Sequence, residues 1–170
     1  MAKNAVPNIF TLGNLSCGIL SLMMTFQGEY KAASLFILLA GLMDRYDGRV
    51  ARFLNVSSEL GKELDSLADL VSFGVAPSIL VFNIYNFSQL GLIGYLLVLL
   101  FPLSGAYRLA RYNITSFDGI FTGIPITVAG MLMALYSLFT MNRISNPVLT
   151  ILLVVMFSYL MISKVRFKKV

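Results

Sequence analysis

Long runs of apolar residues, separated by short polar breaks, set the pattern of the chain. The six runs span about Ile9–Phe26, Ala32–Phe53, Leu60–Tyr85, Leu90–Leu109, Ile120–Thr140 and Pro147–Ile162. Each break contains Gly, Asn, Ser or Pro, which favour turns. Because a membrane-crossing helix needs about 20 apolar residues, the pattern predicts six transmembrane helices. The runs are too long and too uniformly apolar for the alternating strands of a membrane barrel, so we expect no strands.

Two smaller features bear on the helix boundaries. Pro77, Pro102 and Pro125 fall inside predicted helices, which lipid-embedded helices tolerate when neighbours satisfy the freed carbonyl groups. The segment "GIFTG" (Gly119–Gly123) has the small-xxx-small spacing of close helix contacts. The alternative is that this segment is a loop entering the fifth helix.

Composition agrees with a membrane protein. Of the 170 residues, 58% are hydrophobic and 12% are charged, and the mean hydropathy is +0.82. A soluble domain is typically about 45–50% apolar and about 25% charged. We therefore predict a single all-α integral membrane domain over residues 1–170. No polar region with a cleavage-like site precedes the first run, so we expect a retained helix rather than a signal peptide.

Positive charge is distributed unevenly between the predicted connections. The side shared by the N-terminus, the second and fourth loops and the C-terminus carries Lys3, Arg45, Arg49, Arg52, Lys62, Arg108, Arg111, Lys164, Arg166, Lys168 and Lys169. The opposite side carries only Lys31 and Arg143. This asymmetry predicts that both termini face the cytoplasm, in the cytoplasmic membrane. The net charge of +5 therefore says little about nucleic acid, and we expect no nucleic-acid partner. We expect the basic tail "SKVRFKKV" to contact anionic membrane lipids.

The absent residue types narrow the chemistry. Histidine does not occur, which excludes histidine metal ligands, histidine general bases and Ser-His-Asp triads. The single cysteine, Cys17, lies in an apolar run and can form no intrachain disulfide, so we expect a buried packing residue. Any catalysis must use carboxylates, Arg, Lys, Ser, Thr, Tyr or the backbone.

Acidic residues gather where the second run meets the third. Asp44 and Asp47 are three residues apart at the end of the second predicted helix, and Asp65 and Asp69 are four apart near the start of the third. Both spacings place a pair on one helix face. The short "NVSS" turn makes these helices antiparallel, so the pairs can face each other. Four converging carboxylates at a membrane edge are costly unless divalent cations neutralise them.

The ligand types indicate which cations. An all-oxygen set favours Mg²⁺, Mn²⁺ or Ca²⁺ over Zn²⁺. Four carboxylates suffice for two ions, and ions about 3.5–4 Å apart can clamp the attacking and leaving oxygens of a phosphoryl transfer. Gly48, Ala51 and Gly61 would leave room for a ligand beside the helices. Arg52, on the same face as Asp44, could grip a phosphate.

Two other interpretations compete with this one. Charges at a helix end are often a solvated cap with surface ion pairs, which we expect of Arg45, Arg49, Glu59 and Glu63. A cation transporter or channel would also use membrane carboxylates, but near the bilayer midplane and often in repeated halves. Here the acids lie at one end, and no second half repeats them.

The segment from Asp44 to Asp69 contains a motif with eight fixed positions. The fixed positions of D-x2-D-G-x2-A-R-x8-G-x3-D-x3-D are Asp44, Asp47, Gly48, Ala51, Arg52, Gly61, Asp65 and Asp69. This resembles the signature of the CDP-alcohol phosphotransferase family at all eight positions. The flanks "PNIFTLGNLSCG", "ELDSLADLVSFGVAPS", "YRLARYN" and "GIPITVAG" resemble the phosphatidylserine synthase branch, and together these segments cover most of the chain.

The resemblance implies a six-helix membrane fold, usually a homodimer, with a site open to the cytoplasm. It implies two divalent ions, Mg²⁺ or Mn²⁺, bound by Asp44, Asp47 and Asp65, with Asp69 completing the second ion's shell and acting as general base. The nucleotide contacts it implies are Gly48, Ala51, Arg52, Ser58, Asn14 and Thr11.

The implied reaction transfers the phosphatidyl group from CDP-diacylglycerol to the hydroxyl of L-serine and releases CMP. Arg108 and Arg111, three apart at the end of the fourth helix, would hold the serine carboxylate or a substrate phosphate, with help from Lys62. The alternative is that these arginines anchor the helix at the headgroups. Residue chemistry also leaves open another acceptor, such as glycerol 3-phosphate, inositol phosphate or a related polyol.

Overall fold

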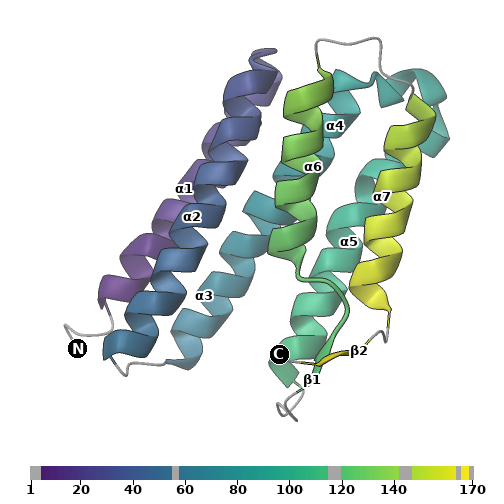
Figure 1. The fold of residues 1–170 in the computed structure, drawn as a ribbon. Coiled ribbons are helices and arrows are strands. Elements are labelled where there is room, and N and C mark those ends of the chain that lie inside the picture. The colour runs from purple at the N-terminus through teal and green to yellow at the C-terminus, as the bar shows by residue number, and fades with distance from the viewer. Residues whose placement is uncertain (1–4, 55–57, 115–119, 142–146, 164–165, 169–170) are drawn as a thin grey trace.

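The computed structural model describes residues 5–54, 58–114, 120–141, 147–163 and 166–168, in which six helical rods lie side by side (Figure 1). The first three rods are α1 (Ala5–Phe26), α2 (Tyr30–Leu54) and a composite of α3 (Glu59–Asp69), the π-helical turn η2 (Leu70–Val75) and α4 (Ala76–Ile84). The 3₁₀ turn η3 (Phe87–Leu90) precedes α5 (Leu92–Ile114), α6 (Ile126–Thr140) and α7 (Pro147–Ile162). The prediction of an all-α fold is confirmed for these rods.

Three of the rods are long and apolar enough to cross a membrane: Asn8–Phe26, Glu59–Ile84 and Leu92–Ile114. The other three differ in kind. α6 and α7 are apolar but have only 15 and 16 residues, and α2 loses its apolar character at Asp44. A multi-pass membrane protein follows from these helices, while six crossings and the orientation of the termini stay predictions.

The segment before α6 corrects the predicted fifth helix. Ile120–Thr122 forms strand β1, which pairs antiparallel with β2 (Arg166–Lys168), so the expectation of no strands is wrong for this short pair. Gly123 follows with a φ of 75°, a left-handed conformation that ends the strand and suits glycine. The helix therefore begins at Ile126, with Pro125 as its N-cap rather than inside it.

The structure also places the other two prolines of the predicted helices and the end of the "GIFTG" segment. Pro77 lies in the first turn of α4, and Pro102 lies inside α5, as predicted. Gly119 lies outside the described residues. At Gly123 an added Cβ would lie 2.5 Å from the carbonyl oxygen of Met161, so this glycine lets the loop pass close to the end of α7. The loop interpretation of the segment is the one that fits the described residues.

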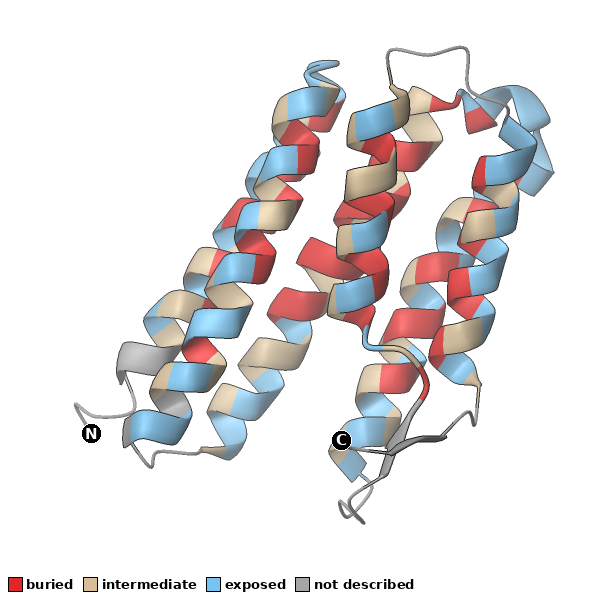
Figure 2. Ribbon diagram, in the orientation of Figure 1, coloured by how far each residue is buried: buried red, intermediate tan, exposed pale blue. Residues whose placement is uncertain are grey.

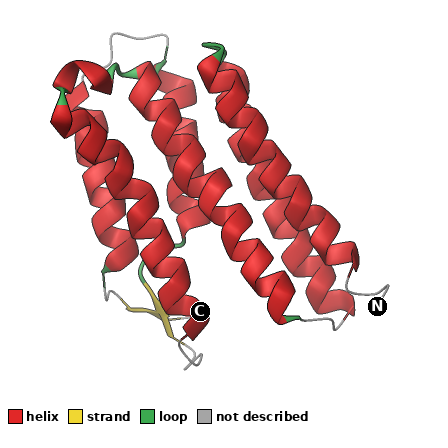
Figure 3. Cartoon of the chain, turned by 180° about the vertical axis from the view of Figure 1, so that it is seen from behind, coloured by secondary structure: helices red, strands yellow, loops and turns green. Residues whose placement is uncertain are grey.

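The rods pack in pairs around a central core. α1 packs along α2, α5 along α7, and α6 packs against α2, η2 and α4. Viewed from behind, the same rods span the molecule with the short β-pair at one end (Figure 3). The buried residues concentrate where α4, α5 and α6 meet, among them Phe73, Leu80, Phe101, Ile126 and Met133 (Figure 2).

The outward faces are also apolar. Leu35, Leu92, Leu99, Leu132 and Leu152 are each about half exposed or more. A continuous apolar exterior is unfavourable in water but is what hydrocarbon tails require. Cys17 is buried and free, as predicted.

A close approach between α1 and η2 fixes the position of the turn that follows Asp69. η2 lies directly after Asp69 and is pressed between α1 and α6. A Cβ at Gly18 would lie 2.9 Å from the Cα of Ser72, so only glycine permits this separation of α1 from η2. π-Helical turns are rare in proteins, but those that occur often lie at functional sites, because they shift the direction of the side chains around them.

Candidate metal centre

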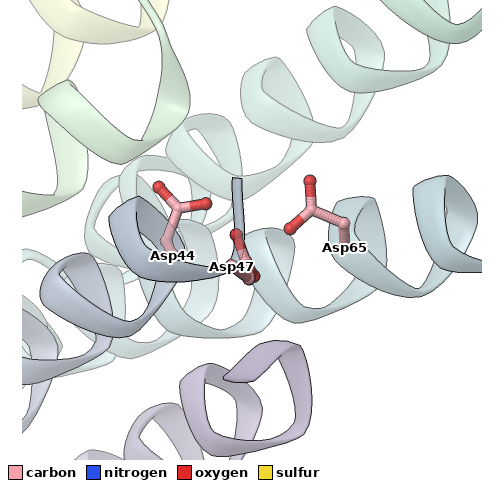
Figure 4. A group of neighbouring side chains, drawn as sticks. All are labelled: Asp44, Asp47 and Asp65. Carbon is pink, nitrogen blue, oxygen red and sulfur yellow. The ribbon is translucent and has the colours of Figure 1, made fainter. Parts of the chain in front are cut away.

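Three carboxylates from two helices converge near one end of the bundle. Asp44 and Asp47 come from α2 and Asp65 from α3, and each offers an oxygen within 4.8 Å of the others (Figure 4). We call these three residues the aspartate cluster. The antiparallel course of α2 and α3, which follow each other closely in the chain, brings the two groups together (Figure 1).

The start of α3 is fixed locally by a helix cap. The hydroxyl of Ser58 accepts a hydrogen bond of 3.0 Å from the backbone N–H of Gly61. This satisfies one of the free N–H groups that begin a helix and sets where α3 starts. Ser58 was predicted to contact a nucleotide, and the structure gives its hydroxyl this capping role.

The aspartate cluster lacks internal compensation. Asp47 is 6% exposed, and Asp44 and Asp65 are half-buried. The Oδ1 atom of Asp65 is buried and has no hydrogen-bond partner among the described residues. A buried acceptor beside two further carboxylates is costly for the protein alone. These donors fit a hard divalent cation, which accepts several carboxylate oxygens at once.

The pKa values of Asp44 and Asp47 also reflect the crowding of carboxylates at this end of α2. Burial and the nearby Asp47 raise the pKa of Asp44 to about 6. Burial also raises the pKa of Asp47, although the hydrogen bond from Thr11 opposes this. A bound cation would lower both pKa values by stabilising the charged forms.

Asp69 lies one helical turn beyond Asp65 and outside the aspartate cluster. It is 8% exposed, and its Oδ1 accepts a hydrogen bond of 3.0 Å from Nδ2 of Asn14 in α1. The hydroxyl of Ser72, in η2, donates to the main-chain oxygen of Asn14 at 2.9 Å. Two hydrogen bonds thus join α1 to the rod that carries Asp65 and Asp69.

α1 supplies a second donor to the acids. Thr11 Oγ1 donates to Oδ2 of Asp47 at 3.1 Å. Thr11 and Asn14 were predicted to contact a nucleotide, but both are buried, and the structure places them against aspartates. Residue chemistry alone missed this role. The available signal was the spacing of three, which places two polar side chains on one face of an apolar helix.

The small residues of the motif have different surroundings. Gly48 is half-buried, and an added Cβ there would lie 3.5 Å from Nη1 of Arg52, so the exposed arginine folds back over this glycine. At Gly61, an added Cβ would lie 3.4 Å from Oδ1 of Asn8. The side chain of Ala51 lies outside what the structure describes.

The predicted acceptor-binding cations separate into two groups. Arg108 is 8% exposed, its Nε has no hydrogen-bond partner among the described residues, and it interacts electrostatically with Asp69. Arg111 instead donates from Nη1 to the carbonyl oxygen of Ile162 in α7 at 3.1 Å. Lys62 donates to the carbonyl oxygen of Asn113 at 3.3 Å. Of these three cations, Arg108 is the one that is buried and has a donor without a partner among the described residues.

The remaining charged residues of the segment face outward. As predicted for a solvated helix end, the exposed ones are Arg45, Arg49, Glu59 and Glu63. Glu63 also accepts a hydrogen bond of 3.2 Å from Nδ2 of Asn113, which ties α3 to the end of α5. This contact supports packing rather than the acidic site.

Comparison with known proteins gives concordant matches. The family model described as CDP-alcohol phosphatidyltransferase matches residues 4–167. The chain is 40% identical over 165 residues to the CDP-diacylglycerol–serine O-phosphatidyltransferase of Bacillus subtilis (strain 168), covering 96% of this chain and 90% of that protein. It is 38% identical over 177 residues to the protein of the same name from Helicobacter pylori (strain ATCC 700392 / 26695), covering 96% and 73%.

A third relative carries a different name. The chain is 36% identical over 172 residues to the archaetidylserine synthase of Methanothermobacter thermautotrophicus, covering 98% of this chain and 70% of that protein. All three names refer to serine or a serine lipid.

Proposed function

The chain belongs to the CDP-alcohol phosphatidyltransferase family, and on that premise we propose that it is a CDP-diacylglycerol–serine O-phosphatidyltransferase. It would transfer the phosphatidyl group from CDP-diacylglycerol to the hydroxyl of L-serine and release phosphatidylserine and CMP. The observation that carries the proposal is the aspartate cluster, formed by residues of the family motif on two helices. The names of the relatives support serine as the acceptor.

The metal part of the proposal rests on the donor set. Asp44, Asp47 and Asp65 would hold the first ion, and Asp69 would complete the shell of a second. Three carboxylate ligands within 4.8 Å and the unpartnered Oδ1 of Asp65 support this assignment. Two Mg²⁺ or Mn²⁺ ions would supply charge neutralisation at the pyrophosphate. Oxygen ligands alone favour these ions over zinc.

Asp69 is the proposed general base. It would accept the proton of the serine hydroxyl as the serine Oγ forms a bond to the phosphorus that carries diacylglycerol. The bond from that phosphorus to the CMP oxygen breaks, and CMP leaves with the electron pair. Correct positioning of the two reactants would account for much of the rate, as in other phosphoryl transfers.

Nucleotide binding is assigned to the exposed side of α2. Arg52 folds back over Gly48, so its guanidinium could contact a phosphate oxygen of a nucleotide bound beside this glycine. Gly48 and Ala51 would let the nucleotide approach the backbone. Ser58, which immediately precedes α3, remains a predicted contact of the nucleotide.

Arg108 is the proposed partner of the serine carboxylate. Its Nε is a buried donor without a protein partner among the described residues, and it lies within electrostatic reach of Asp69. A carboxylate held there would present its hydroxyl group near the base. Arg111 and Lys62, which bind backbone oxygens of α7 and α5, would act at most on a substrate phosphate.

The proposed location is the cytoplasmic membrane, with the site facing the cytoplasm. The excess of Lys and Arg at the end that carries the aspartates supports this orientation. A homodimer is a further prediction from the family resemblance.

An acceptor panel tests the function directly. The purified chain would be incubated with CDP-diacylglycerol, Mg²⁺ or Mn²⁺, and one alcohol at a time: L-serine, glycerol 3-phosphate or inositol phosphate. We expect CMP release and a phosphatidylserine mass only with serine. Reaction with glycerol 3-phosphate and none with serine would overturn the acceptor, and no CMP release with any alcohol would overturn the enzyme class.

A further inference from the structure

We propose that Asn14 is a positioning residue that acts through Asp69, rather than a contact of the nucleotide. This proposal rests on the proposed function and deepens it, because it assigns to α1 the task of holding the base in place. The side-chain amide of Asn14 would keep the Asp69 carboxylate directed toward the acceptor and the second metal ion.

The first support is the contact itself. Asn14 Nδ2 donates to Asp69 Oδ1 at 3.0 Å, a normal length for an N–H···O bond. The two residues are 55 positions apart, so the contact depends on the packing of α1 against α3. Asp69 follows Asp65 by one turn of an α-helix, and the described residues give its Oδ2 no hydrogen bond.

The second support is the burial of Asn14. Its exposed fraction is 0%, and its Oδ1 has no hydrogen-bond partner among the described residues. A side chain enclosed by protein cannot stack on or hydrogen-bond a nucleotide that arrives from the membrane surface. An asparagine retained in such a place, with one of its polar atoms unsatisfied, costs stability and needs a compensating use.

The third support is the way that the backbone of Asn14 is anchored. Ser72 Oγ donates to its main-chain oxygen at 2.9 Å, and Ser72 itself is fully buried. The close approach at Gly18, one turn along α1, makes this contact reachable. The donor is therefore held from both sides: by its own helix and by η2, the turn that immediately follows Asp69.

A neutral amide is suited to this task. A lysine or arginine at this place would pair with Asp69 and weaken it as a base and as a metal ligand, because a fixed positive charge stabilises the carboxylate. An amide N–H orients the carboxylate and adds no net charge. Partners of this kind around metal-binding carboxylates typically affect metal affinity or activity by about 10–100-fold.

The test compares two variants with a matched control, each as the purified full-length chain. Asn14→Leu keeps the approximate size and removes the donor. Asn14→Ser, which is smaller and cannot reach Asp69, serves if the leucine variant does not fold. Ser21→Ala is the control, since Ser21 lies on the same helix, is equally buried and has no hydrogen-bond partner for its hydroxyl in the part of the chain that the structure describes.

Three readouts separate positioning from the other roles. We expect kcat to fall about 10–100-fold in both Asn14 variants. We expect the KM for CDP-diacylglycerol and the affinity for CDP to stay within about threefold of the wild type, because a positioning residue does not touch the nucleotide. We expect Mn²⁺ binding, followed by titration calorimetry, to weaken about tenfold at the weaker site. Ser21→Ala should match the wild type in all three.

Two results would overturn the proposal. One is a tenfold or larger loss of CDP affinity with unchanged kcat, which would make Asn14 a nucleotide contact. The other is a wild-type kcat per folded molecule with only a lower unfolding temperature, which would make it a packing residue. If the wild type itself transfers no phosphatidyl group, the proposed function fails, and the Mn²⁺ titration alone decides: weakened binding in the Asn14 variants supports positioning, and unchanged binding refutes it.

Discussion

Two groups of buried and half-buried polar side chains lie toward opposite ends of the bundle and are built differently. The aspartate cluster lies between α2 and α3. Toward the other end, where α4, α6 and α7 meet, lies a hydroxyl cluster formed by Tyr85, Tyr136, Thr140 and Thr150. Tyr136 OH and Thr150 Oγ1 are 2.9 Å apart, Tyr85 OH bonds to Thr140 Oγ1, and Thr140 Oγ1 lies 2.6 Å from the carbonyl oxygen of Tyr136.

The difference follows from what each group can donate. A hydroxyl both donates and accepts, so the hydroxyl cluster satisfies itself. An ionised carboxylate only accepts, so several of them cannot satisfy one another. Thr11 and Asn14 supply two donors to the acids, while no described residue donates to the Oδ1 atom of Asp65. The hydroxyl cluster is complete as a protein structure, whereas the aspartate cluster lacks donors that a bound cation would replace.

The largest effect is expected from Asp69→Asn. The amide cannot take a proton from the acceptor hydroxyl, so turnover should fall by about 10²–10⁴-fold. The change removes a charge from a crowded acidic site, so the protein should stay folded. Turnover is measured as CMP release, and folding as the midpoint of thermal unfolding. Near-normal turnover would remove the assignment of Asp69 as the base.

A second variant sharpens the contrast through metal-dependent stability. A cation that binds the folded state alone stabilises it by roughly 2.7 kcal/mol at 100 times its Kd. We therefore expect Mg²⁺ or Mn²⁺ to raise the unfolding temperature of the wild type by several degrees, and that of Asp65→Asn by far less. Tyr85→Phe, which alters only the hydroxyl cluster, is the control and should respond like the wild type. An equal response of Asp65→Asn would place the ion elsewhere.

The pH dependence should also distinguish the two clusters. Since the pKa of Asp44 is raised to about 6, the metal-free protein binds a proton there as the pH falls below that value. Protons and cations compete for the same carboxylate, so Mn²⁺ affinity should weaken as the pH falls through 6. It should fall by roughly tenfold per pH unit below 6 for one competing proton. Calorimetric titrations from pH 7.5 to 5 measure this, and a flat profile would contradict it.

The smallest effect is expected from Tyr85→Phe. The change removes one hydroxyl from a neutral network in which Thr140 keeps its bond to the Tyr136 carbonyl. The free energy of unfolding should fall by about 1 kcal/mol, with kcat unchanged. Chemical or thermal unfolding and the CMP assay check the two parts. A tenfold loss of kcat would break the contrast, because the hydroxyl cluster would then take part in activity.

Hydropathy located the helices because the rods are apolar over most of their length. Five of the six runs match helical rods to within a few residues. The exception was the start of α6, where β1 is as apolar as a helix and only Gly123 and Pro125 mark the break. Strand pairing with β2 connects segments distant in sequence, which local periodicity cannot reveal.

The site was predictable where charge spacing on single helices decides it. Asp44, Asp47 and Asp65 meet because a short turn joins two antiparallel helices, and both facts are visible in the sequence. Contacts between helices were not predictable in this way. The hydrogen bond of Asn14 to Asp69 depends on the approach of α1 to η2 at Gly18, and a π-helical turn has no simple residue signature.

The central claim is that the acids of α2 and α3 hold divalent ions that activate a CDP-linked lipid for attack by serine. The most direct measurement is phosphatidylserine formation by the purified chain before chelation, after exhaustive chelation, and after Mg²⁺ or Mn²⁺ is returned. The account predicts that formation stops in the metal-free protein and recovers with the added ion. Undiminished formation after complete removal of divalent metal would contradict it.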